Sequence, residues 1–95
     1  MLNAAQIRAA RGLVNWTQPE LAKQSGLALG TIQRMEKIGT GRSSVANVEA
    51  VQRALEAAGV AFIPENGGGA GVRLARPGRE DEGKRPDELN ATNDD

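Results

Sequence analysis

Residues 17–37 constrain the fold more than any other stretch, because they contain two short helical patterns separated by only a few residues. The first pattern starts with a capping box in which Thr17 precedes Glu20 by three positions. Pro19 lies in its first turn, where the missing N–H is harmless. Gly26 ends the pattern, because glycine adopts positive φ angles at little cost. The stretch therefore predicts two short helices joined by a tight turn.

The second helix of this pair is predicted over residues 29–37 and is amphipathic. Ile32 and Met35 share one face, which we expect to be buried. The other face carries three long polar side chains, Gln33, Arg34 and Lys37. The pattern indicates a helix that packs through its apolar face and leaves its polar face exposed.

Two further helices are predicted on either side of this pair. Asn3 and Gln6 form a capping box at the start of the first, and Asn15 tolerates the left-handed turn that ends a helix. Ser44 is the expected N-cap of the last helix and Gly59 its end.

The connection between the pair and the last helix is less regular. A flexible loop is expected at residues 39–41, where threonine lies between two glycines. A break near residues 46–47 would divide the last helix in two. The sequence therefore predicts four to five helices.

A β-hairpin is predicted after the helices. Residues 60–64 and 71–75 show the alternation of a half-buried strand pair, with apolar side chains at Val60, Phe62, Val72 and Leu74, and a glycine-rich segment joins them. An isolated two-stranded hairpin is marginally stable in water. This hairpin must therefore lie on the helices or pair with the same strands of a second subunit.

Residues 76–95 contain one large apolar side chain, Leu89, and cannot bury enough surface to offset the entropy of ordering. We expect a disordered tail. It carries four basic and seven acidic side chains, a net charge of −3, so residues 1–75 carry +3 in a chain that is neutral overall. The tail is either a solubilising end or an acidic segment that binds a partner or shields a basic surface. A basic body permits nucleic-acid binding.

Composition excludes several classes of protein. The 95 residues suffice for one small domain, and the chain has neither cysteine nor histidine. Disulfides, the usual zinc ligands and histidine-activated nucleophiles are therefore missing. We expect no metal, no cofactor and no enzymatic activity, because the carboxylates are scattered rather than paired. No membrane span, signal peptide or small-molecule effector domain is evident, so we expect a soluble cytoplasmic protein.

An ordered set of residues lies in and around the helix pair: Thr17, Gln18, Leu21, Ala22, Gly26, Thr31, Ile32, Arg34 and Glu36. This set resembles the Xre/Cro-like helix-turn-helix family of phage repressors and small bacterial regulators. The resemblance covers roughly residues 3–60, and the hairpin is similar to an extension of some small bacterial members. It implies a mainly α fold: a four- to five-helix bundle with a helix-turn-helix DNA-binding domain at 1–60, a β-hairpin extension at 61–75 that is a candidate dimer contact, and a disordered acidic tail at 76–95.

The resemblance also implies which residues contact double-stranded DNA. Gln18 matches a residue that contacts the DNA backbone, and Arg11 with Glu36 matches a salt bridge between the first helix and the recognition helix. Arg42 and Ser43 match a loop that grips phosphates. The full set of implied DNA contacts is Thr17, Gln18, Leu29, Gly30, Thr31, Gln33, Arg34, Lys37, Arg42 and Ser43.

The start of the recognition helix departs from the family pattern. Ala28 stands where Ser or Thr often caps this helix. Leu29 offers only apolar contact, for instance to a thymine methyl, and Gly30 offers no side chain but allows close approach. Base reading would then depend mainly on Gln33 and Arg34, which favours two copies acting together.

The leading functional hypothesis is a sequence-specific transcriptional regulator that binds an inverted repeat in double-stranded DNA as a homodimer, through the major groove. The alternative is a helix-turn-helix-shaped module of antitoxin or antiactivator type that binds mainly another protein. In that case Leu27 and Leu29 would belong to an exposed apolar contact patch.

Overall fold

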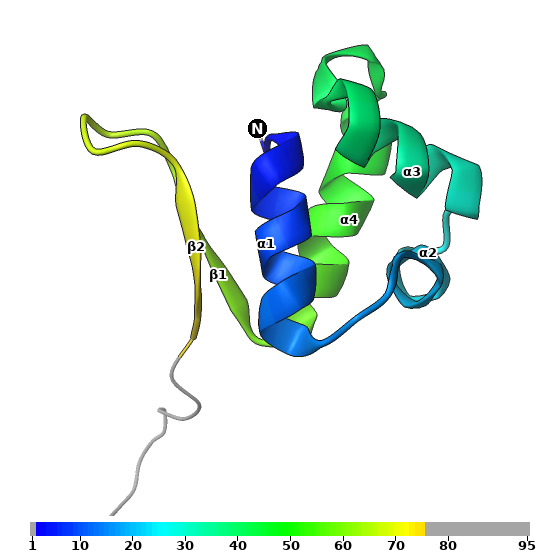
Figure 1. Cartoon of the computed structure of the whole chain (residues 1–95), viewed down its shortest axis with the longest axis horizontal. Helices are drawn as coiled ribbons and strands as arrows, with labels where there is room; N and C mark the ends of the chain where they lie inside the picture. The colour runs from blue at the N-terminus through cyan, green and yellow to red at the C-terminus, as the bar shows by residue number, and fades with distance from the viewer. Residues whose placement is uncertain (1, 76–95) are drawn as a thin grey trace, which may run out of the picture.

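A computed structural model describes residues 2–75; the tail predicted at residues 76–95 lies outside the described residues. The described chain is mainly helical, as predicted (Figure 1). Its elements are α1 (Ala4–Val14), α2 (Gln18–Ser25), α3 (Leu29–Ile38), the 3-10 turn η1 (Thr40–Arg42), α4 (Val45–Ala57), β1 (Val60–Ile63) and β2 (Gly71–Leu74).

Local side-chain hydrogen bonds explain where α1 begins and ends. The Asn3 side chain accepts from the backbone N–H of Gln6 at 2.8 Å, and the Gln6 side chain accepts from the backbone N–H of Asn3 at 2.9 Å. The predicted capping box is therefore present. Asn15 ends α1 in the left-handed conformation, with φ of 59° and ψ of 37°.

The predicted capping box of α2 is only half formed. Thr17 accepts from the backbone N–H of Glu20 at 3.2 Å. The Glu20 carboxylate does not complete the box and instead accepts from the side chain of Gln24, one helical turn further on, at 2.6 Å. This alternative hydrogen bond is possible because side chains at positions i and i+4 are neighbours on a helix surface. Gly26 ends α2 with φ of 73°, as predicted.

The last helix is continuous, so the predicted break near residues 46–47 is wrong. Ser44 accepts from the backbone N–H of Asn47 at 3.1 Å, which fixes the first turn of α4 as ordinary N-capped helix. The described residues therefore contain four α-helices and not five. The predicted end at Gly59 is close to the observed last helical residue, Ala57.

The loop predicted to be flexible at residues 39–41 is tied to the N-terminus. Thr40 begins the 3-10 turn η1 and is 7% exposed. Its hydroxyl donates to the backbone carbonyl of Leu2 at 2.6 Å. The flanking glycines indicated flexibility, but a long-range hydrogen bond buries the residue between them.

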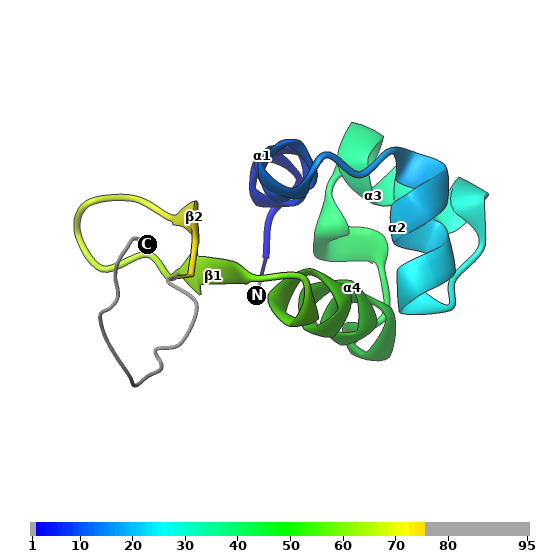
Figure 2. The same cartoon turned by 90° about the horizontal axis from the view of Figure 1, so that it is seen from below.

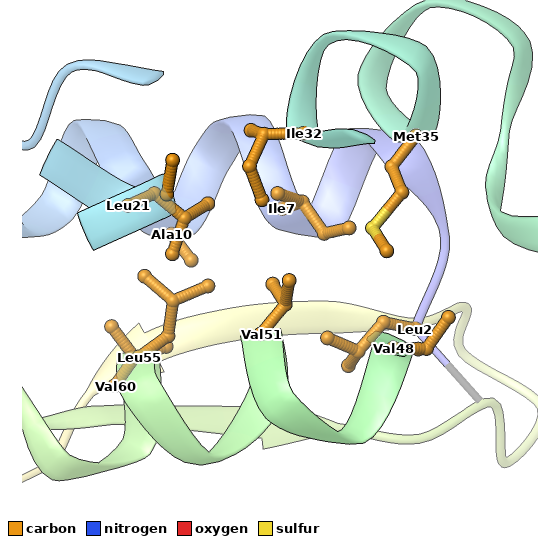
Figure 3. Close-up of a cluster of buried hydrophobic side chains, with 11 residues drawn as sticks. Leu2, Ile7, Ala10, Leu21, Ile32, Met35, Val48, Val51, Leu55 and Val60 are labelled. Carbon is orange, nitrogen blue, oxygen red and sulfur yellow. The ribbon is translucent and has the colours of Figure 1, made fainter. Parts of the chain in front are cut away.

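All four α-helices and the first strand contribute to one apolar core. Its largest fully buried side chains come from α1, α2, α3 and α4: Ile7, Leu21, Ile32, Met35, Val48, Val51 and Leu55 (Figure 3). Ile32 and Met35 are the apolar face predicted for the second helix of the pair. The core therefore fixes which side of α3 points inward.

The hairpin lies on the helices, which is one of the two arrangements left open by the sequence. β1 and β2 are antiparallel, with Val60 opposite Leu74 and Phe62 opposite Val72. Val60 belongs to the core, and Phe62 and Val72 pack against it. Leu74 is 54% exposed, so the prediction of a half-buried position is wrong there. The hairpin and α3 lie on opposite sides of α1 and α4 (Figures 1 and 2).

Candidate nucleic-acid interface

The exposed side of α3 brings together five of the predicted contact positions. Leu29, Gly30, Gln33, Arg34 and Lys37 are all exposed. At about 3.6 residues per turn they fall within an arc of roughly 140° around the helix. The remaining arc contains the buried Ile32, Met35 and Glu36. Thr31 is half-buried beside the exposed arc.

Behind this face, Glu36 holds α3 through a polar network. Arg11 of α1 donates to both carboxylate oxygens of Glu36, from Nε at 2.7 Å and from Nη2 at 2.8 Å. The Glu36 side chain is only 4% exposed and that of Arg11 21%. The salt bridge implied by the family resemblance is thus present as a bidentate pair.

The environment of Arg11 favours its charged form. The hydrogen bond to Glu36, helped by the negative charge of the carboxylate, raises the pKa of Arg11 above its ordinary value against the opposing effect of burial. Arg11 also donates from Nη1 to the backbone carbonyl of Trp16 at 3.1 Å. One guanidinium therefore joins α1, α3 and the segment that leads into α2.

Gln18, which was predicted to contact DNA, also belongs to this network. Its side-chain Nε2 donates to Glu36 Oε1 at 3.1 Å, and the residue is half-buried. A carboxylate only accepts hydrogen bonds, so the amide nitrogen of Gln18 has to face Glu36. The other predicted residue at the start of α2, Thr17, is exposed and caps the helix.

Sequence reasoning missed Arg8. Its guanidinium Nη1 donates to the backbone carbonyl of Glu36, in the last turn of α3. The last four carbonyls of a helix lack intrahelical partners and favour a nearby cation. Arg8 thus supports α3 from α1. The packing of α1 on α3 brings Arg8 to this carbonyl, so no local sequence pattern predicts the contact.

The turn after α3 carries the remaining predicted contacts. Arg42 is exposed at the end of η1 and Ser43 is half-buried next to it. The hydrogen bond from Thr40 to Leu2 fixes this turn relative to the helices. Arg42 therefore projects from a structured turn rather than from a free loop.

The exposed charged side chains of α3 and the following turn are all positive. Between residues 29 and 43 the cations Arg34, Lys37 and Arg42 are exposed, and the only acidic side chain is the buried Glu36. Because Arg11 neutralises Glu36, the exposed cations face solvent without an acidic neighbour in this segment. Such a surface attracts polyanions.

The apolar patch imagined for a protein-binding module does not form as expected. Leu29 is 38% exposed, but Leu27 is partly buried and packs against the core. Of the two leucines, Leu29 is therefore exposed and Leu27 only partly so. Two further findings concern residues 2–75: no helix there is long and apolar enough to cross a membrane, and no group of three acidic, histidine or cysteine side chains could hold a metal ion.

No model of a known protein family matches the sequence, and a search of curated proteins finds no match either.

Proposed function

We propose that this protein is a transcriptional regulator of the Xre/Cro-like helix-turn-helix type, with α3 as the recognition helix in the major groove of double-stranded DNA. The observation that carries the proposal is the exposed face of α3, on which Gln33, Arg34 and Lys37 are polar or cationic. Arg11, Gln18 and Glu36 hold the helix from behind. A recognition helix needs an outward polar face and a fixed orientation.

The exposed residues divide into base readers and phosphate contacts. Arg34 can donate two hydrogen bonds to guanine, and Gln33 can bind adenine. Lys37 and Arg42 suit phosphates, as do the free backbone N–H groups at the start of α2. Gln18 would contribute through its amide oxygen or its second N–H, because one N–H is donated to Glu36.

The small number of base readers favours a homodimer on an inverted repeat. One bidentate contact discriminates between bases by about 1–3 kcal/mol, whereas specific sites exceed nonspecific DNA by about 4–10 kcal/mol. Two copies double the readers Gln33 and Arg34. The proposed regulator therefore binds two half-sites about one helical turn apart.

Two arginine substitutions distinguish base recognition from phosphate binding. Arg34→Ala should lower the ratio of specific to nonspecific affinity at least about 30-fold, because one bidentate base contact, worth about 1–3 kcal/mol, is lost in each of the two half-sites. Arg42→Ala should weaken all duplexes alike and reduce the salt slope by about one unit for each bound copy. The measurement is fluorescence anisotropy at several salt concentrations, on duplexes selected from genomic fragments and on random duplexes.

Arg53→Ala serves as the matched control, because Arg53 is an exposed arginine of α4, outside both the predicted DNA contacts and the hairpin. It should change neither ratio nor slope by a comparable amount. Equal loss on selected and random DNA for Arg34→Ala would remove its base-reading role. The proposal would be overturned in favour of a protein-binding module by two results together. The protein would bind no duplex at low salt, and it would purify in a stoichiometric complex with another protein.

A further inference from the structure

The N-terminal end of the exposed α3 face differs chemically from the rest of it. Ala28, Leu29 and Gly30 are consecutive, exposed and without a polar side-chain atom. Ala28 makes no side-chain capping hydrogen bond to α3. The other exposed residues of the face, Gln33 and Arg34 among them, are long and polar. The face therefore has an apolar end and a polar end.

Nothing in the fold itself calls for glycine at position 30. A Cβ atom built on Gly30 would meet no atom within 4 Å, and the residue is not among those with positive φ. Alanine would fit there and is the better helix former. The effect of the missing side chain is thus directed outward: it leaves the backbone of α3 open to close approach by a partner.

We propose that Leu29 and Gly30 form a recognition site for the C5-methyl group of thymine. This inference rests on the proposed function, in which α3 enters the major groove. The thymine methyl is the apolar group that base edges present in that groove, and an apolar side chain is its natural contact. Leu29 supplies the apolar surface, and Gly30 lets the helix backbone come close enough for contact.

The position of this site along α3 predicts its register on the DNA. Leu29 and Gly30 precede Gln33 and Arg34 by four residues, which is about 6 Å along the helix axis. Successive bases on a strand rise by about 3.4 Å. Because α3 lies in the groove and not parallel to the DNA axis, the thymine should therefore lie within about two base pairs of the pair that Arg34 or Gln33 reads.

The test removes the methyl group and nothing else. The full chain selects duplexes from genomic fragments, and each thymine of a selected duplex is then replaced singly by deoxyuridine. At one position in each half-site the replacement should weaken binding about fourfold, the value for one buried methyl group, with little effect elsewhere. Replacing both positions should weaken binding about 15-fold.

Protein variants assign the effect to the two residues. Leu29→Ala should reduce the difference between thymine and deoxyuridine, because alanine offers a smaller apolar surface to the methyl group. Gly30→Ala should weaken the selected duplex at least fivefold by overpacking the contact, while it raises the melting temperature by about 2 to 8 °C. Gly12→Ala is the matched control: Gly12 is an exposed glycine in α1 whose added Cβ would also meet nothing within 4 Å. It should stabilise the protein similarly and leave DNA binding unchanged.

The outcomes distinguish this inference from the function on which it rests. The methyl site alone would be overturned if the protein bound selected duplexes but no deoxyuridine replacement weakened that binding. The same holds if Gly30→Ala left the binding unchanged. In both cases the regulator proposal would stand. Absence of any selective binding would overturn both. The site would be supported if Gly30→Ala raised stability and lowered affinity, and if Leu29→Ala reduced the deoxyuridine effect.

Discussion

At the scale of single residues, Glu36 connects α3 to two other elements. Its carboxylate accepts from Arg11 and Gln18, and its backbone carbonyl accepts from Arg8. Three side chains from two other elements thus converge on one residue of the proposed recognition helix. Such a pair orients a helix even where desolvation offsets much of its attraction.

Glu36 is more deeply buried than Arg11, so removing one partner or the other should have unequal effects on stability. Arg11→Met should lower the free energy of unfolding by about 3–5 kcal/mol, because it leaves the buried carboxylate of Glu36 without a counter-charge. Glu36→Met should cost less, since Arg11 is more exposed and can extend its guanidinium into water. Urea unfolding followed by circular dichroism measures both.

The double variant provides the control for this pair. It should be more stable than Arg11→Met alone, because neither charge is then left unpaired. Two results would contradict the explanation by burial of the Glu36 carboxylate. One is a larger loss of unfolding free energy for Glu36→Met than for Arg11→Met, and the other is a double variant whose loss equals the sum of the two.

At the scale of elements, Gln6 links the first helix to the hairpin. Its Oε1 completes the capping box of α1, and its Nε2 donates to the carbonyls of Ile63 at 3.3 Å and Gly71 at 3.1 Å. These two residues pair at one end of the ladder between β1 and β2. One glutamine therefore fixes a helix start and holds a two-stranded sheet that would be marginal alone.

Gln6→Glu should loosen the hairpin without unfolding the helices. The substituted side chain can still accept from Asn3, but it turns an acceptor toward the carbonyls of Ile63 and Gly71, at a cost of about 1–3 kcal/mol. Hydrogen exchange should show faster exchange in residues 60–74 and unchanged rates in α3. Gln24→Ala, which removes an exposed hydrogen bond to Glu20, should change neither. Uniformly faster exchange would show that the hairpin is not a separate unit.

At the scale of the whole molecule, the hairpin and the proposed DNA-binding face lie on opposite sides of α1 and α4 (Figure 2). This arrangement leaves the exposed side of α3 free of the molecule's own strands. A second copy can then place its α3 on the same side of a DNA duplex, one helical turn away.

The dimer hypothesis predicts a strict dependence on half-site spacing. The full chain should bind a selected duplex with two copies, as measured by sedimentation velocity. Insertion of about five base pairs between the half-sites turns one of them to the opposite side of the duplex, so affinity should fall to that of a single half-site. Addition of about five base pairs outside the two half-sites is the control for length alone. Equal affinity for all spacings, or one copy per duplex, would contradict the hypothesis.

The elements most accurately predicted from the sequence are those determined by neighbouring residues. Asn3, Thr17 and Ser44 cap their helices because each hydroxyl or amide reaches a backbone N–H three positions on, whatever the rest of the chain does. Asn15 and Gly26 end helices because they accept the left-handed conformation. The outward face of α3 follows from the apolar spacing of Ile32 and Met35.

The tertiary structure alone decided the contacts between distant residues. Local patterns do not show that Arg8 reaches the end of α3, that Thr40 bonds to Leu2, or that Gln6 reaches the hairpin, because these partners meet only when the helices pack. The sequence by itself therefore determined the helices and the exposed face of α3. Packing around the buried Glu36 decided how that face is held, since burial of a charge requires partners that only the assembled fold can supply.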